Sequence, residues 1–151
     1  MSQFHNIFCR SADPFSRADL AVFVSESWYG DGDPRFEPGR DDVADWDRLT
    51  VTLPGVARPL LFLHDTRPED VQEMVQEAVE KLGGKAQSVL DHLRETVQMI
   101  GVELSPTAMT EDAWEMLDIV QAKICRRLDG IVFAPDGVYD KDLQLIVAVS
   151  G

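Results

Sequence analysis

The clearest pattern in the first half of the chain is the alternation of residues 48–53, in which three apolar side chains share one face. Leu49, Val51 and Leu53 are separated by threonines, which is typical of a strand with one buried and one wet face. A Pro54-Gly55 turn leads to the apolar run 60–63. The two segments together predict an antiparallel hairpin.

Two further strands are predicted before this hairpin. Residues 20–25 read Leu-Ala-Val-Phe-Val-Ser, apolar enough for a strand buried on both faces. A weaker alternation places another strand at the N-terminus, through Phe4, Ile7 and Phe8. The first half of the chain therefore reads as strands.

The second half opens with helical periodicity. Behind a predicted capping box at residues 66–69, apolar residues repeat at helical spacing up to a Gly83-Gly84 stop. A second helix is predicted from Ala86 to Ile100, ending at Gly101, with a short strand at 102–104. A third begins at a Thr110 cap, and its acidic start and basic end suit the helix dipole.

The chain closes with two predicted strands, at 131–133 and 143–149, on either side of a Pro135-Asp136-Gly137 turn. Strands followed by helices and again by strands favour the α+β class. We expect residues 1–151 to form a single domain, with a mixed or antiparallel sheet of five or six strands. The three helices are expected on one face of it.

An acidic, aromatic-rich segment interrupts this pattern at residues 26–47, hereafter the acidic segment. It holds eight carboxylates and two arginines, and so carries six of the thirteen net negative charges of the chain. At about 20 residues it is long for a connection in a compact domain, and such connections are usually functional or disordered. The sequence predicts no regular element here.

Carboxylates mixed with large aromatic rings suit the capture of a basic protein, because the charges steer the partner and the rings supply contact area. We therefore predict a protein-binding site within the acidic segment. Its expected residues are Trp28, Tyr29, Asp31, Asp33, Glu37, Asp41, Asp42, Asp45 and Trp46. Replacing Trp46 by alanine is expected mainly to speed dissociation of the partner.

Charge and missing motifs exclude several classes of function. A net charge of −13 argues against nucleic acid and anionic membranes as partners. The sequence has no phosphate-binding glycine loop and no nucleophile elbow, and its histidines lack metal-ligand spacing, so we expect no cofactor, metal or catalytic residue. There is no signal-peptide pattern and no apolar run of bilayer length, so the expected compartment is the cytoplasm.

Residues 128–140, Leu-Asp-Gly-Ile-Val-Phe-Ala-Pro-Asp-Gly-Val-Tyr-Asp, resemble the C-terminal part of small bacterial immunity proteins that are associated with polymorphic toxins. The resemblance covers about a tenth of the chain and implies no residue-level site. It implies a class of function, neutralisation of a toxin. A nuclease toxin has a basic active-site cleft, which an acidic aromatic surface can plug.

Two alternatives stay open at this point. In the first, the protein is a small enzyme or ligand-binding domain with the acidic segment as a lid and His64 near the site, where a strand ends. In the second, it is an oligomeric structural protein. The acidic flank of the first predicted helix offers another binding patch, formed by Glu69, Asp70, Glu73, Glu77 and Glu80.

Overall fold

The computed structural model of the chain describes residues 2–149 and has the predicted α+β class, with one sheet in which every strand pairing is antiparallel. The described residues form eight strands, where five or six were predicted. The strands are β1 (Gln3–Cys9), β2 (Arg35–Glu37), β3 (Arg48–Thr52), β4 (Leu60–Asp65), β5 (Gln98–Leu104), β6 (Gly130–Ala134), β7 (Gly137–Tyr139) and β8 (Leu145–Ala148).

Four α-helices accompany the sheet within residues 2–149, one more than predicted. They are α1 (Arg17–Ser27), α2 (Pro68–Leu82), α3 (Gln87–Arg94) and α4 (Glu111–Leu128), with a single 3₁₀ turn, η1 (Pro106–Ala108), before α4. The strand order is β2-β3-β4-β5-β1-β6-β7-β8, so the N-terminal strand lies inside the sheet between β5 and β6. The short strand β2 forms one edge and β8 forms the other.

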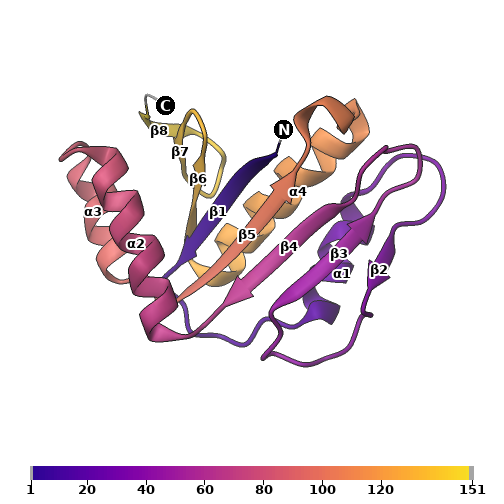
Figure 1. Cartoon of the computed structure of the whole chain (residues 1–151), viewed down its shortest axis with the longest axis horizontal. Coiled ribbons are helices and arrows are strands. Elements are labelled where there is room, and N and C mark those ends of the chain that lie inside the picture. Colours follow the sequence, from indigo (N-terminus) through magenta and orange to yellow (C-terminus); the bar gives the residue numbers. More distant parts are fainter. Residues whose placement is uncertain (1, 150–151) are drawn as a thin grey trace.

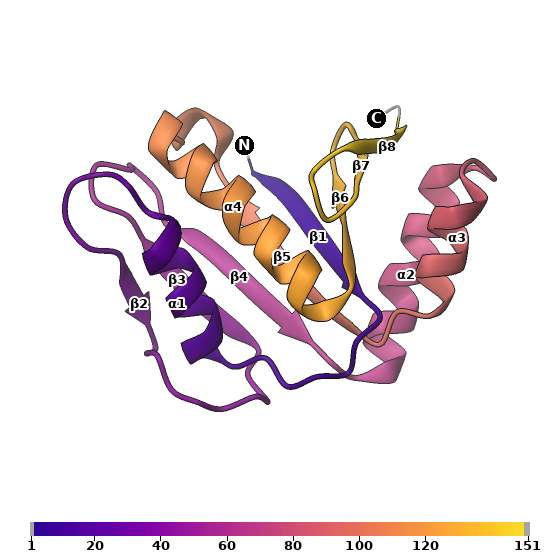
Figure 2. The same ribbon diagram turned by 180° about the vertical axis from the view of Figure 1, so that it is seen from behind.

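Helices pack on both faces of the sheet, which corrects the prediction that all of them lie on one face. Side chains of β1 alternate between two separate cores: Ile7 packs with the apolar residues of α1 and α4, and Phe8 packs with those of α2 and α3. Figures 1 and 2 show α1 and α4 on one side, with α2 and α3 standing together beyond the end of the strands. Only the end of β1, residues 7–9, is buried on both faces, and Phe4 near its start is 49% exposed, so the strand shows no consistent alternation.

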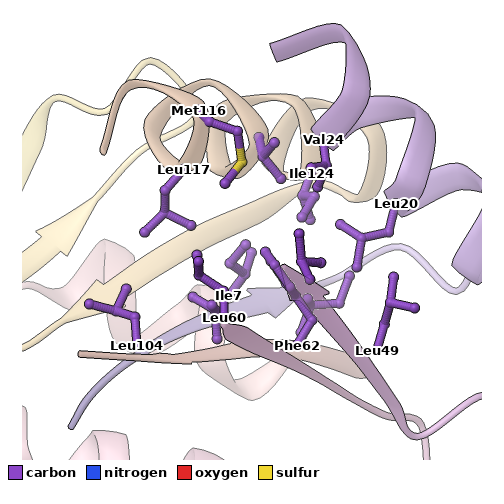
Figure 3. Close-up of a cluster of buried hydrophobic side chains, with 14 of the residues drawn as sticks. Ile7, Leu20, Val24, Leu49, Leu60, Phe62, Leu104, Met116, Leu117 and Ile124 are labelled. Atoms are coloured by element: carbon purple, nitrogen blue, oxygen red, sulfur yellow. The ribbon is translucent and has the colours of Figure 1, made fainter. Parts of the chain in front are cut away.

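The larger core lies between the sheet and α1 and α4. Figure 3 shows Leu20 and Val24 from α1 and Leu117 and Ile124 from α4 pointing toward the strands, where they meet Phe62 and its neighbours. All five side chains are fully buried. This layer fixes α1, and with it the start of the acidic segment.

The strand predicted at residues 20–25 is wrong, because these residues belong to α1. Ser16 caps the helix: its side chain accepts a hydrogen bond from the Asp19 amide, and the Asp19 carboxylate accepts one from the Ser16 amide. The buried positions Leu20 and Val24 follow helical spacing, but Val22 is apolar and exposed. That residue hid the 3.6-residue period and made the run look uniformly buried.

The second predicted helix is also too long. It ends at Arg94, where the Glu95 and Thr96 amides bond to carbonyls of the last turn. Residues 98–104 instead form β5, which pairs with both β4 and β1. A strand in the middle of the sheet is apolar on both faces, so its composition matches that of a buried helix.

Other predictions are confirmed. The 48–53 and 60–63 segments form the antiparallel pair β3–β4, and the Thr110 side chain caps α4 by accepting from the Ala113 amide.

The predicted capping box at Thr66 is not formed. Arg67 is the N-cap of α2 and makes no side-chain cap bond, while Gly83 ends the helix, as predicted, with a left-handed φ of 60°.

Candidate functional site

The acidic segment lies at one end of the molecule, where it runs from the end of α1 through the edge strand β2 to the start of β3 (Figure 1). It is more regular than predicted. Glu26 is still part of α1, and residues 35–37 form β2, which pairs with β3 and sets Phe36 opposite Val51. The remaining residues, 28–34 and 38–47, are irregular connections.

Trp46 fastens the second connection to the body of the protein. It is 3% exposed, its indole Nε1 donates to the Phe15 carbonyl oxygen at 2.7 Å, and its ring stacks on His64 with centroids 4.7 Å apart. Trp46 belongs to the larger core. Its ring therefore offers almost no surface to a partner, although the sequence predicted it as a contact residue.

Trp28 fastens the first connection in a similar way. Its indole Nε1 donates to the Gly32 carbonyl oxygen at 3.2 Å, so residues 28–32 curl over the ring. A Cβ added at Gly30 would collide with three atoms of this ring. The side chain packs into the larger core. Tyr29 points the other way and is 67% exposed, which leaves it as the large aromatic contact that residues 26–47 present to solvent.

Arg17, at the start of α1, fixes the second connection, residues 38–47, through hydrogen bonds and ion pairs. Its guanidinium donates to the Arg48 carbonyl oxygen at 2.9 Å and to the Asp41 carboxylate at 3.1 Å, and it lies 3.7 Å from Asp47. The Ala18 amide also donates to the Asp41 carbonyl oxygen at 2.9 Å. These bonds give an irregular stretch of chain a defined course.

The eight carboxylates of the acidic segment are all on exposed residues. Three of them have a cation nearby: Asp41 and Asp47 face Arg17, and Glu26 lies 3.4 Å from Lys123. The other five form no ion pair within residues 2–149, and these are Asp31, Asp33, Glu37, Asp42 and Asp45. We call these five carboxylates the unpaired acidic surface.

The alternative acidic patch, on α2, lies at the opposite end of the molecule from the acidic segment (Figure 1). Four of its five members, Glu69, Glu73, Glu77 and Glu80, are exposed on the solvent side of the helix. Asp70 pairs with Arg67 at 2.8 Å. The two patches are thus separate surfaces that mutations can test independently.

His64, the residue of the enzyme alternative, is buried and fully engaged. Its Nδ1 lies 3.1 Å from the Trp46 carbonyl oxygen and its Nε2 lies 2.9 Å from Gln98 Oε1. The Gln98 amide nitrogen donates to the carbonyls of Ser11 and Asp13, which fixes the orientation of its oxygen toward the histidine. Both ring nitrogens are therefore engaged by groups of the protein itself, and neither is directed at a substrate.

The sequence did not predict the residues that hold the acidic segment in place, which are Phe15, Arg17 and Gly30. They were missed because none of them bears an acidic or exposed aromatic group. One signal was available. Ser16-Arg17-Ala18-Asp19 has the spacing of a helix N-cap, and recognising it would have turned residues 20–25 into a helix with Arg17 in its first turn.

Removing the Arg17 guanidinium is expected to loosen the second connection. In R17M, which keeps most of the apolar stem, loss of the bonds to Arg48 and Asp41 should cost about 1–3 kcal/mol of local stability. Hydrogen exchange of the amides in residues 41–47 should speed up accordingly. R40M is the matched control, because Arg40 is exposed and only lies over the Phe36 ring, 5.5 Å from its centroid. Equal exchange in both variants would contradict the role of Arg17.

Comparison of the chain with protein-family models, with curated proteins and with solved structures finds no match. Within residues 2–149, no helix has both the length and the apolar character needed to cross a membrane.

Proposed function

We propose that the protein is a non-catalytic binding protein whose unpaired acidic surface captures a basic protein, as an immunity-type inhibitor of a basic toxin does. The observation that carries the proposal is that five exposed carboxylates have no ion-pair partner within residues 2–149, although their backbone is docked on the core by Trp28, Trp46 and Arg17. Charges held in place in advance lose little conformational entropy when a partner binds.

The apolar part of the contact comes from exposed side chains beside these charges. Tyr29 and Val43 are 67% and 48% exposed, and both lie within the acidic segment. In this arrangement the carboxylates govern the rate of encounter, and the apolar side chains govern the lifetime of the complex. A nuclease toxin is a fitting target, because its cleft is built to attract a polyanion.

Removing charge from the acidic segment is expected to weaken capture of the partner. The test uses immobilised wild-type protein and the variant D31N/D33N/D42N/D45N in a native lysate, with bound proteins identified by mass spectrometry. Wild type should retain a basic protein at about 0.05 M salt and release it near 1 M, where charges are screened within about 3 Å. The variant should bind it about 10- to 100-fold more weakly at low salt.

A variant with the same change in net charge provides the control. E69Q/E73Q/E77Q/E80Q removes four exposed carboxylates from α2 and should capture the partner as well as wild type does. The captured protein should be an enzyme that loses its activity when one equivalent of this chain is added. If both variants lose the same affinity for the partner, the effect comes from net charge alone. If the acidic-segment variant still retains the partner as wild type does, the unpaired acidic surface is not the binding site.

A further inference from the structure

A cavity of about 490 Å³ lies between the sheet and α4, and none of its lining residues belongs to the acidic segment. The spacing of residues along α4 and β1 explains which side chains line this cavity. Trp114, Asp118 and Gln121 share one face of α4 at helical spacing, while Gln3 and His5 share one face of β1. Figure 2 shows α4 beside β1, with β6 and β7 beyond. The volume falls within the range of small-molecule sites.

The charge of this cavity is one-sided. Asp118 and Asp136 line it, and no lining residue is lysine or arginine. Asp118 is exposed and forms no ion pair within residues 2–149. The surrounding protein displaces enough water to raise the pKa of Asp118 above its ordinary value. Asp118 is nevertheless an exposed residue, so a cation can reach a carboxylate whose hydration is partly reduced and which has no ion-pair partner within residues 2–149.

His5 does not supply that counter-charge. Burial lowers its pKa, against a weaker opposing effect of Asp136, so the neutral imidazole is favoured. Its Nδ1 lies 3.1 Å from the Gln121 amide nitrogen, which donates to it. The remaining nitrogen, Nε2, is buried and has no hydrogen-bond partner within residues 2–149. Because Nδ1 accepts, Nε2 carries the proton and is a donor, so a cation is placed at Asp118 and not at this nitrogen.

Aromatic side chains complete the wall. Trp114 and His5 have ring centroids 6.4 Å apart, and the Tyr139 hydroxyl donates to Asp136 at 2.9 Å. That bond raises the pKa of Tyr139, so the phenol stays neutral. Aromatic faces attract cations through the ring quadrupole, and the attraction grows where water is displaced.

The lining also contains a residue in an unfavourable backbone conformation. Leu143 has a φ of 58°, which bulky residues rarely adopt. The turn around it is held by Asp140, whose Oδ1 accepts from the amides of Asp142 and Gln144, both at 2.9 Å, and by an Asp142–Arg126 ion pair at 2.9 Å. Strain that neighbouring residues maintain in this way is frequent at ligand sites.

We propose that this cavity binds a small organic cation, an ammonium or guanidinium group on an apolar body, with the charge at Asp118 and the body against Trp114 and Tyr139. The carboxylate and the aromatic faces supply the attraction, and the absence of lysine and arginine from the lining removes repulsion. This site is independent of the proposed capture of a basic protein.

Titration of the ¹⁵N-labelled protein with 2-phenylethylamine, followed by ¹H–¹⁵N correlation spectra, tests the site. Binding with a Kd of about 0.1–1 mM is expected for a ligand of this size. It should move the indole resonance of Trp114 and leave those of Trp28 and Trp46, which lie outside the cavity, unchanged. The neutral analogue 2-phenylethanol should bind at least about tenfold more weakly, since it cannot make the charged contact.

D118N should weaken binding of 2-phenylethylamine about tenfold or more. E115Q is the matched control: Glu115 is exposed on the same helix but does not line the cavity, so its affinity should stay within about twofold of wild type. Binding should also weaken as the pH falls through the pKa of Asp118, because protonation removes the charge that the cation requires.

Two further ligands separate the sources of the cation. Agmatine represents free amines, and Nα-acetyl-lysine methylamide represents a lysine side chain of another protein; the one that binds more tightly identifies the source. Equal affinity for 2-phenylethylamine and 2-phenylethanol, unchanged affinity in D118N, or no shift of Trp114 at about 10 mM ligand would each overturn the proposal.

Discussion

Replacing Trp46 by alanine is expected to lower the free energy of unfolding by about 3–5 kcal/mol. The ring is 3% exposed within the larger core, so its removal leaves a cavity where the acidic segment meets the sheet. It also leaves the Phe15 carbonyl oxygen without its 2.7 Å donor and His64 without its stacking partner. A domain of this size has about 5–15 kcal/mol of stability, so this single change removes a large part of it.

Chemical denaturation followed by far-ultraviolet circular dichroism measures this effect without relying on tryptophan fluorescence. Y29A is the matched control, because Tyr29 is an aromatic residue of the same segment that is 67% exposed. Its stability should stay within about 0.5 kcal/mol of wild type. If W46A proves as stable as Y29A, the second connection is not docked on the core as described.

The same pair of variants changes how binding data should be interpreted. From the sequence, the alanine variant of Trp46 was expected mainly to speed dissociation of a partner. A buried ring makes W46A a folding variant first, so weaker binding by it would not identify Trp46 as a contact residue. Y29A tests the aromatic contact directly, since it removes exposed surface and leaves the fold in place.

Elements with a single buried face could be predicted from the sequence. The hairpin of β3 and β4 alternates, and α2 and α4 carry an apolar stripe at helical spacing, because in each case one side meets water. The pattern of apolar and polar residues therefore predicts an element correctly where one of its faces is buried and the other meets water.

Elements that are enclosed or atypical could not be predicted in this way. β5 is buried on both faces, so the sequence predicts its first part, up to Ile100, as helix and only residues 102–104 as strand. α1 exposes Val22, so the sequence predicts its apolar run as a strand. The presence of helices on both faces depends on long-range packing of β1, which separates Ile7 from Phe8. Nothing local in the sequence encodes that arrangement.

The two candidate sites also differ in how far the sequence predicts them. The acidic segment is contiguous, so its charge was evident at once, although the burial of its two tryptophans was not. The cavity beside α4 combines residues near position 5, positions 114–121 and positions 132–143. Each of these groups has an ordinary structural explanation when taken alone, and they come together through the pairing of β1 with β6 and the packing of α4 on these strands.

The two buried thiols are expected to make the protein lose stability as the pH rises from about 9 to about 12. Cys9 and Cys125 are both free and buried in the core between β1 and α4. Burial raises the pKa of Cys125 from its ordinary 9.0 to about 12, and burial, followed by the neighbouring thiol, raises that of Cys9 as well. In the unfolded chain both thiols ionise near pH 9, so above that pH the unfolded state holds fewer protons.

The sign follows directly: a raised folded-state pKa stabilises the native state fully below pH 9, and this contribution disappears between the unfolded and folded values. Each thiol should lower the unfolding free energy by about 1.4 kcal/mol per pH unit in this window, or about 4 kcal/mol in all for Cys125. Denaturation of wild type and C125A from pH 7 to 11 measures the difference, in which tyrosines and lysines common to both cancel. C9A/C125A should lack the thiol contribution altogether.

Thiol reactivity gives an independent measure of the same packing. At pH 8 a thiol reagent should modify the native protein at least about 1,000-fold more slowly than the unfolded chain, because both sulfurs become accessible only when β1 separates from α4. The rate should then report the opening free energy of the larger core. Rapid modification of either cysteine under native conditions would contradict the burial of these thiols. The same conclusion would follow if the unfolding free energy of wild type and of C9A/C125A fell equally with rising pH.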